Sequence, residues 1–411
     1  MADLVKVDER RVVARLVELA RLGALPDGGC YRPLYSPAWL AATQLVTRWM
    51  KEAGLLVRRD AVGNVWGRVE GKQAGRVVAT GSHLDTVRSG GALDGALGVV
   101  AAIEAVTSLN AVHGRPQRIL EAVAICEEEG SRFSTNFWGA RAITGKIEPE
   151  EAADVRDPEG MTVADAMRGV GLDPDAIPKA ARLDIDAFVE LHIEQGPVLE
   201  GAGARLGVVR TIAGTAHLAV AVRGRPDHAG TMAMADRHDA LVGAAAMIGR
   251  IAEVASEAGH PAVATVGAVS VEPGQVNVVP GVATFTVDAR HSDPERRTAL
   301  VEAIVAACKR IAHERGLEIE VRTLRDRPPL GLDGALAKTL VRACEAAGVT
   351  PRDMVSGAGH DSQVLASVCR TGMLFVPSVG GRSHCPEEAT EADDVILGTR
   401  VLATAIRELA Y

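Results

Sequence analysis

Apolar and polar positions along the chain follow two periodicities, one typical of helices and the other typical of strands. Near the amino terminus, apolar residues at helical spacing follow Asp8, a residue type that caps helices. A second helical pattern runs from about Pro37 to Ala53 and is closed by Gly54, which suits a left-handed terminator. A third, rich in alanine, covers Ala96–Leu109. We therefore expect two surface helices and one buried helix in this part of the chain.

Short apolar runs alternate with these helices and predict strands. The runs cover Leu55–Arg58, Asn64–Val69, Arg76–Thr80, Arg118–Cys126, Ala187–His192 and Gly372–Val376. Further helical patterns cover Val163–Val170, Asp333–Ala347, Asp361–Ser367 and Glu391–Leu409. This alternation is typical of an α/β fold, and we expect a mixed, mostly parallel sheet flanked by helices. In such folds the ligand sites lie at the carboxyl ends of the strands.

The pattern changes near Thr211. Half-buried strands are predicted at His217–Arg223, Ala262–Val271, Val282–Ala289 and Glu318–Arg322, and long helices at Asp239–Ala258 and Asp293–Gly316. This order predicts an α+β domain in which two helices face a four-stranded sheet. We assign residues 211–328 to this domain and residues 1–210 and 329–411 to the larger one.

Composition and charge narrow the class of protein. At 411 residues the chain exceeds the size at which one hydrophobic core keeps growing, which supports two domains. The formal charge of −8 and the lack of any lysine-arginine run argue against nucleic acid as a partner. No secretion signal and no apolar stretch of about 20 residues is present, which argues against a membrane. Six scattered cysteines without a Cys-x-x-Cys pair indicate reduced thiols, so we predict a cytoplasmic protein.

Five His, Asp and Glu side chains stand beside glycines or other turn signals at predicted strand ends and loops. They are His83, Asp94, Glu129, His192 and His384. Nitrogen and oxygen donors of this kind suit Zn²⁺, with Mn²⁺, Co²⁺ or Ni²⁺ as alternatives. Asp94 has two carboxylate oxygens and can bridge two cations; we expect His83 and His192 to serve one ion, and Glu129 and His384 the other. Because His384 lies beyond residues 211–328 and the other four lie before them, that domain must be an insertion.

Two further acids have predicted roles beside these ions. Asp85 lies two residues after His83 on a strand end, so it can fix the imidazole tautomer. Glu128 alternates away from Glu129, so it can take a proton from an activated water and pass it to a leaving nitrogen. Glu127 is interpreted as a solvated or structural acid. Isolated histidines are ordinarily surface or hydrogen-bonded residues, and we interpret five others in this way: His113, His238, His260, His291 and His313.

The motifs around these residues resemble those of the M20 family of metal-dependent amidohydrolases and peptidases. The resemblance covers nearly the whole chain, and the motifs occur in the same order along the sequence as in the family. The motifs are Gly81–Thr86, Gly91–Gly95, Glu127–Phe133, Leu191–Gly196 and Ser383–Glu387. A histidine at position 192 resembles the hydantoinase/carbamoylase branch of the family. The peptidase branches generally have an acidic ligand at the same place in this motif. That branch includes N-carbamoyl-L-amino acid hydrolases, allantoate and ureidoglycolate amidohydrolases, and β-ureidopropionases. Cys126 departs from the pattern, since a more polar residue is expected there.

The resemblance implies a catalytic domain interrupted by a lid domain that also forms a homodimer. It implies that His228, in Pro226–Thr231, stabilises an oxyanion. Asn277 and Arg290 resemble the pair that binds the substrate carboxylate, and an Arg fork suits two carboxylate oxygens. Gln195 and His360 resemble contacts to the ureido end of the substrate. A surface ion pair is the alternative for Arg290, and a helix cap is the alternative for His360.

The resemblance also implies a reaction and a substrate class. We expect two divalent ions and hydrolysis of the linear amide C–N bond in an N-carbamoyl-L-amino acid or a close ureido acid. The products are the amino acid, ammonia and carbon dioxide. An allantoate or ureidoglycolate amidohydrolase is the first alternative, because it uses the same ligands. His192 argues against an M20 peptidase or acylase, and the intact ligand set with Glu128 argues against a non-catalytic binding protein.

Overall fold

Residues 4–148 and 150–411 are described by the structure, a computed structural model of the chain. The fold divides into two compact units. Unit 1 comprises the chain up to Arg210 together with Leu332–Met354 and Gly359–Tyr411. Unit 2 comprises Thr211–Gly331 and Val355–Ala358. Residues 329–331 and 355–358 thus belong with unit 2, although the sequence pattern assigned them to the larger domain.

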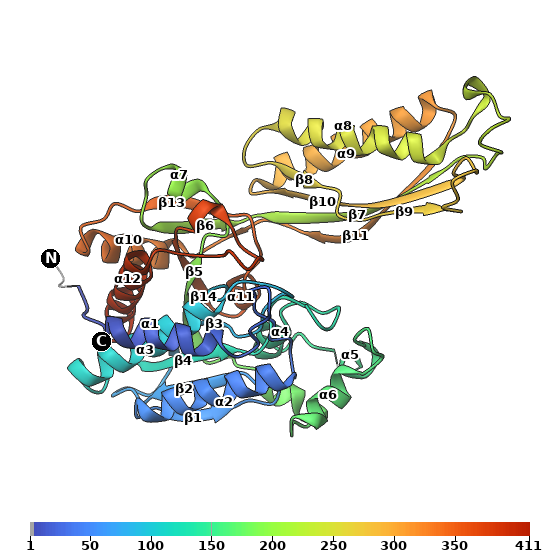
Figure 1. Cartoon of the computed structure of the whole chain (residues 1–411). Coiled ribbons are helices and arrows are strands. Elements are labelled where there is room, and N and C mark those ends of the chain that lie inside the picture. The colour runs from blue at the N-terminus through green and yellow to red at the C-terminus, as the bar shows by residue number, and fades with distance from the viewer. Residues whose placement is uncertain (1–3, 149) are drawn as a thin grey trace. The chain divides into compact units, whose positions relative to one another are not determined.

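A nine-stranded mixed sheet, most of which belongs to unit 1, forms the centre of that unit (Figure 1). Its strands in spatial order are β1 (Leu56–Arg59), β2 (Val65–Val69), β4 (Ile119–Ile125), β3 (Val77–His83), β5 (Ile185–Ile193), β14 (Arg370–Val376), β6 (Gly207–Ile212) and β12 (Leu330–Gly331), with β13 (Arg352–Ser356) also paired to β6. The central strands β4, β3, β5 and β14 run parallel, and β1, β2, β6 and β12 pair antiparallel. The predicted mixed sheet is confirmed, with its parallel part confined to four central strands.

The four parallel strands end side by side. His83, the last residue of β3, is in register with Ile125, the last residue of β4. His192, near the end of β5, is in register with Phe375, near the end of β14. Carboxyl ends of adjacent parallel strands share one edge of a sheet. The segments after β4 and β14 carry the predicted acids and the last predicted histidine, so distant parts of the sequence meet at this edge.

Helices flank the sheet of unit 1, as predicted. They are α1 (Glu9–Ala20), α2 (Pro37–Glu52), α3 (Ala96–His113), α4 (Trp138–Ile143), α5 (Glu151–Asp154), α6 (Val163–Gly169), α7 (Val198–Gly201), α10 (Gly334–Ala346), α11 (Asp361–Leu365) and α12 (Ala392–Ala410), with 3₁₀ turns η1 (Pro174–Ala180) and η3 (Val379–Gly381). The predicted helix ends are confirmed for α1 and α2. The Asp8 side chain accepts a hydrogen bond from the backbone N–H of Arg11, and Gly54 has a φ of 74° just after α2.

The helix α3 is the buried helix that its apolar sequence predicted. It packs against β3, β4, β5, α1 and α12. By length and composition it resembles a membrane span, but 72% of its apolar window is buried inside the protein. Its single acid, Glu104, is fully buried and lies 2.7 Å from Arg11 Nε, which neutralises its charge. The apolar surface of α3 therefore belongs to the core of unit 1.

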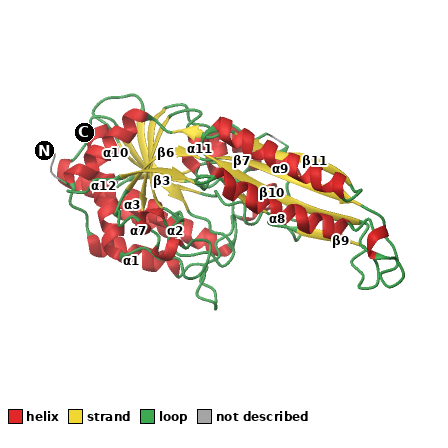
Figure 2. Ribbon diagram, turned by 90° about the horizontal axis from the view of Figure 1, so that it is seen from above, coloured by secondary structure: helices red, strands yellow, loops and turns green. Residues whose placement is uncertain are grey.

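Unit 2 is a five-stranded antiparallel sheet faced by two long helices, α8 (Ala240–Ala258) and α9 (Pro294–Glu314). The strands are β7 (Gly214–Arg223), β8 (Val263–Thr265), β9 (Val269–Glu272), β10 (Val282–His291) and β11 (Glu318–Arg327), and η2 (Met234–Asp236) is a 3₁₀ turn. Figure 2 shows α8 and α9 side by side along these strands. Alternate residues of β7 and β10 are buried, so one face of the sheet forms a core with the helices.

Two features of the sheets differ from the predictions. The predicted strand Ala262–Val271 is divided into β8 and β9, which pair with successive parts of β10. The sheet of unit 2 consequently has five strands where four were expected. The strands β6, β12 and β13 were not predicted, and β6 crosses Thr211, where the sequence pattern changes.

Candidate metal centre

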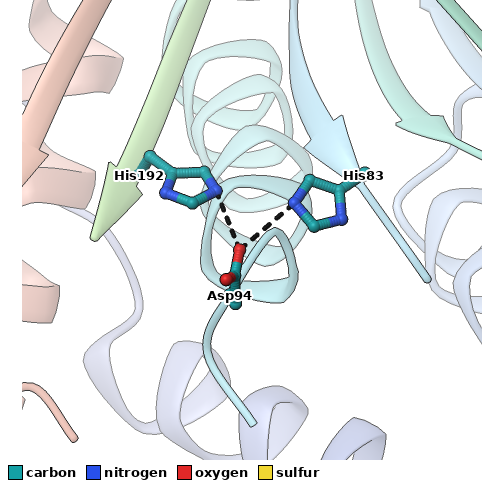
Figure 3. Close-up of side chains that lie close together, drawn as sticks. All are labelled: His83, Asp94 and His192. Carbon is teal, nitrogen blue, oxygen red and sulfur yellow. Dashed lines mark ion pairs between the residues drawn. The ribbon is translucent and has the colours of Figure 1, made fainter. Parts of the chain in front are cut away.

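Asp94 lies at the centre of the predicted ligand set, just before α3. Its Oδ1 atom lies 3.2 Å from Nε2 of His83 and 3.2 Å from Nε2 of His192. Figure 3 shows the two imidazoles, from neighbouring strands β3 and β5, both directed at this carboxylate. Ligand atoms of these three residues lie within 4.8 Å of one another, and all three side chains are buried. One oxygen of Asp94 is therefore shared by two histidines.

The second oxygen of Asp94 faces a different group of side chains. Oδ2 lies 3.2 Å from Nε2 of His384, and the same nitrogen lies 3.3 Å from Oε1 of Glu129. Ligand atoms of these three residues also lie within 4.8 Å of one another. The two groups match the two predicted ligand sets, joined by Asp94. Their role as ligands remains a prediction.

The donor geometry fits a divalent cation in each group. Two ligands of a tetrahedral zinc ion, each about 2.0–2.1 Å from the metal, stand roughly 3.3 Å apart, close to the spacings around Asp94. Nδ1 of His83 faces Oδ1 of Asp85 at 3.2 Å, and Nδ1 of His192 faces the carbonyl oxygen of Ile193 at 2.9 Å. Both histidines therefore carry a hydrogen on Nδ1, and Nε2 is the nitrogen that can bind a cation.

A glycine is required beside the first group of ligands. Gly95 has a φ of 65°, and a Cβ atom at this position would lie 2.5 Å from the ring of His83. The backbone nitrogen of Gly95 also lies 3.3 Å from Nε2 of His192. The glycine after Asp94 thus allows the turn and the close approach of the imidazole.

Asp85 joins the end of β3 to the acidic segment after β4. Its Oδ1 accepts the backbone N–H of Glu128 at 2.9 Å, and its Oδ2 accepts that of Glu129 at 3.2 Å. Since Oδ1 also contacts His83, Asp85 fixes the histidine and the acids relative to one another. This arrangement extends the positioning role predicted for Asp85.

Glu128 lies beside the ligands with a pKa suited to proton transfer. Its carboxylate is buried and forms a close group with His83 and Glu129. Burial raises the pKa of Glu128 well above its usual range, and the negative charge of Glu129 raises it further. A carboxyl group with a raised pKa can both accept and return a proton. Glu127, by contrast, is a buried structural acid that accepts the backbone N–H groups of Gly130 and Trp138.

Hydrogen bonds and charges within the predicted ligand set shift the pKa values of its members. Burial raises the pKa of Asp94, but hydrogen bonds from His192, His384 and His83 outweigh it and hold this pKa well below its usual range. Hydrogen bonds to Asp94 and Glu129 raise the pKa of His384 to about 10. Burial lowers the pKa of His83, yet Asp85 and Asp94 raise it well above its ordinary value. In the absence of ions, protons on the histidines balance the charge of the acids; cations bound there would replace those protons.

Gln195 and His360 also lie at this edge of the sheet. Gln195 has a φ of 61° and donates from Nε2 to Oδ2 of Asp94 at 2.8 Å, so it orients the shared carboxylate. The His360 ring is buried 4.6 Å from the ring of His192, measured between centroids. Burial lowers the pKa of His360 well below its ordinary value, and the positive charge of His192 lowers it further. The nine predicted residues of unit 1 are thus brought together.

The other three predicted residues belong to unit 2. His228 forms an isolated bridge with Val278, and the backbone N–H of Ala229 donates to the carbonyl oxygen of Asn277 at 3.0 Å. His228 and Asn277 therefore lie on paired segments. Arg290 lies on β10, where it forms an ion pair with Asp288 at 2.6 Å.

Sequence reasoning missed two buried acids at the site. Glu388 accepts the backbone N–H groups of Leu93 and Asp94, each at 2.9 Å, and contacts the hydroxyl of Ser383 at 2.7 Å. Glu190, two residues before His192 on β5, accepts hydrogen bonds from Ser82 and Ser362. The sequence offered two signals: the pair Glu387–Glu388 follows His384, and Glu190 lies two residues before His192, on the same face of the strand. Neither signal reveals the tertiary contacts.

Replacing Glu388 with Ala should weaken zinc binding about 10- to 100-fold, the usual effect of losing a group that orients a ligand. The substitution removes the acceptor that holds the backbone of Asp94, and a freer Asp94 binds cations less tightly. Competition with a chromogenic chelator measures this. Glu387→Ala is the matched control, because Glu387 is exposed and forms an ion pair with Arg382 at 2.9 Å rather than with the backbone of Asp94. Equal zinc affinity in the two variants would contradict the role of Glu388.

Comparison with known proteins identifies the family. The chain matches Peptidase family M20/M25/M40 over residues 79–408. It is 41% identical over 409 residues to the N-carbamoyl-L-amino-acid amidohydrolase of Paenarthrobacter aurescens, with 99% of each chain covered. It is 40% identical over 394 residues to the allantoate amidohydrolase of Escherichia coli (strain K12), with 96% of each covered. A crystal structure of an amidase of the hydantoinase/carbamoylase family from Burkholderia multivorans has a TM-score of 0.90 at 34% identity, covering 99% of this chain and 98% of that one. The chain therefore belongs to peptidase family M20/M25/M40, among the hydantoinase/carbamoylase amidases, and it is an amidohydrolase.

Proposed function

We propose that the chain hydrolyses the linear amide C–N bond of N-carbamoyl-L-amino acids, giving the amino acid, ammonia and carbon dioxide. The observation that carries the proposal is the pair of donor groups around Asp94, with Glu128 beside them. A relative that is 41% identical is named for this activity. The proposed metal ligands and Glu128 all belong to unit 1.

The ligands in this proposal are His83, His192 and Asp94 for one divalent ion, and Asp94, Glu129 and His384 for the other. When bound, the ions lower the pKa of a water molecule and polarise the amide carbonyl. The mixed nitrogen and oxygen donors favour Zn²⁺, with Mn²⁺, Co²⁺ or Ni²⁺ as alternatives.

The side chains of the protein perform the proton transfers. Glu128 accepts a proton from the attacking water and delivers it to the leaving nitrogen, for which its buried position and raised pKa are suited. Asp85 holds the backbone of Glu128 and the tautomer of His83, so the acceptor and the ligand keep a fixed geometry. The carboxylate of Asp94 is oriented by Gln195.

Unit 2 supplies the remaining groups in this proposal and serves as a lid. Nδ1 of His228 accepts the backbone N–H of Gly230 at 3.0 Å, so a neutral His228 carries its hydrogen on Nε2. That N–H can donate to the oxyanion of the transition state. Asn277 and Arg290 bind the substrate carboxylate, and His360 of unit 1 contacts the ureido end. We also propose that unit 2 forms a homodimer, and that the protein is cytoplasmic, where its six free cysteines remain reduced.

The second candidate substrate is allantoate. The relative from Escherichia coli (strain K12) that carries this name is 40% identical, close to the value for the carbamoylase relative. Allantoate and ureidoglycolate contain the same ureido group beside a carboxylate, so the same ligands and the same proton carrier serve them. The peptidase alternative is disfavoured by His192, at a position where the peptidase branches have an acidic ligand.

Product release from a panel of substrates distinguishes these candidates: ammonia is measured for the carbamoyl and ureido acids, and free amino acid is measured for a dipeptide. The purified protein, loaded with Zn²⁺ or Mn²⁺, is assayed with N-carbamoyl-L-amino acids, allantoate, ureidoglycolate and a dipeptide at equal concentrations. The proposal expects the largest kcat/KM for one of the N-carbamoyl-L-amino acids. A larger value for allantoate would assign the second candidate function. Activity on the dipeptide alone would contradict both.

A further inference from the structure

Arg290 is held by two neighbours on the face of the sheet of unit 2 that lies away from α8 and α9. Its Nε and Nη2 atoms donate to the two oxygens of Asp288, at 3.0 Å and 2.6 Å. Nε2 of His217 lies 3.3 Å from Oδ2 of Asp288. His217 and Asp288 are direct cross-strand partners of β7 and β10, so the three side chains form one row on the sheet.

The contacts of Arg290 leave two N–H groups of its guanidinium group available. An arginine side chain has five N–H donors. Asp288 takes the Nε–H and one Nη2–H, and the carbonyl oxygen of Gly357 takes one Nη1–H at 2.8 Å. Two donors are left, one on each terminal nitrogen. Arg290 is about one-third exposed, so these two N–H groups can donate to a second carboxylate.

The state of Asp288 supports a fixed arrangement. Burial raises the pKa of Asp288, but hydrogen bonding and charge from Arg290, together with His217, outweigh burial and lower this pKa. Asp288 is therefore an anion at neutral pH. Contacts to Asp288 on one side and to Gly357 on another fix the plane of the guanidinium group, which a single flexible ion pair would not.

We propose that Asp288 and His217 are positioning residues that orient the guanidinium group of Arg290 for recognition of the substrate carboxylate. This inference rests on the proposed function, in which Arg290 binds that carboxylate. Neither residue touches the substrate: Asp288 acts through Arg290, and His217 acts through Asp288. The alternative is an ordinary surface ion pair, which contributes little and affects no particular substrate.

The test compares a substrate with and without its carboxylate. Kinetics are measured for the N-carbamoyl-L-amino acid that the protein uses best and for the corresponding carboxamide. Asp288→Asn should raise KM for the acid by about tenfold or more, because the charged acceptor that fixes Arg290 is lost. It should change kcat/KM for the carboxamide by less than about twofold, since no carboxylate is bound. His217→Phe should produce a smaller rise of the same kind, and His217→Gln, which keeps a donor, should largely restore the native KM.

Glu320→Gln is the matched control. Glu320 lies on the same face of the same sheet and forms a comparable pair with Arg322 at 3.5 Å, but it has no contact with Arg290. This control variant should leave KM for the acid and kcat/KM for the carboxamide unchanged. In an Arg290→Ala background, Asp288→Asn should have no further effect on KM for the acid. If Asp288→Asn does not fold, the two His217 variants provide the same comparison.

Two results would overturn the inference in different ways. Equal effects of Asp288→Asn on the acid and the carboxamide, in a protein whose wild type hydrolyses N-carbamoyl-L-amino acids, would overturn the positioning role alone. A wild type that releases ammonia from none of the carbamoyl or ureido acids would overturn the proposed function and, with it, the assignment of Arg290.

Discussion

Replacing Glu128 with Gln should lower kcat by roughly 10²–10⁴-fold, the range that general acid–base groups contribute, while the metal content stays unchanged. Gln has nearly the same shape as Glu but cannot carry the proton from the attacking water to the leaving nitrogen. The backbone of Glu128, which donates to Asp85, is unaffected by the substitution. Steady-state kinetics on the preferred substrate, together with elemental analysis of the same sample, provide the measurement.

The metal content distinguishes a proton carrier from a ligand. Glu128 lies close to His83 and Glu129, so a role in binding a cation is the competing interpretation. Glu129→Gln is the matched comparison, because it alters the neighbouring acid with the same change of charge. The Glu129 variant should lose one ion per chain, and the Glu128 variant should lose none. Loss of metal in the Glu128 variant, or a kcat within a few-fold of wild type, would contradict the assignment.

Replacing Asp94 with Ala should remove both ions from the protein and abolish activity. Each oxygen of Asp94 faces a different donor group: Oδ1 faces His83 and His192, and Oδ2 faces His384. Loss of this carboxylate leaves each group with two donor side chains. Stable zinc sites have at least three protein ligands, so neither group should then retain its ion. Metal content after dialysis against micromolar zinc, measured by mass spectrometry, tests the expectation.

Single-ligand variants provide the controls for Asp94. His384→Ala removes a donor from one group only, so it should retain one ion. Asp94→Ala should retain none. Ions should also stabilise the folded protein, and the rise in melting temperature on adding zinc should be absent in the Asp94 variant. An Asp94 variant that still binds two ions would contradict the bridging role.

The α/β pattern allowed much of the site to be predicted from the sequence. His83 and His192 are at or near the ends of β3 and β5, and the acids follow β4, so parallel pairing alone brings these residues to one edge. The sequence could not reveal Glu388, which is 294 residues from Asp94 and contacts its backbone. Such a contact depends on how two loops meet, and no local periodicity records it.

The sheet of unit 2 shows a second limit of sequence patterns. One apolar run, Ala262–Val271, predicted one strand, but the chain forms β8 and β9 along the same partner strand, β10. The segment of β9 alternates apolar and polar residues, that of β8 does not, and Gly267 lies in the break between them. The row from Arg290 to His217 was equally hidden, because cross-strand register is a tertiary property.

In our proposal, five side chains hold two cations with Asp94 between them. Anomalous diffraction at the zinc absorption edge, from crystals grown with zinc, tests this most directly. We predict two peaks per chain, one bound by His83, His192 and Oδ1 of Asp94, and the other by Glu129, His384 and Oδ2 of Asp94. A single peak, or two peaks that Asp94 does not join, would contradict the account.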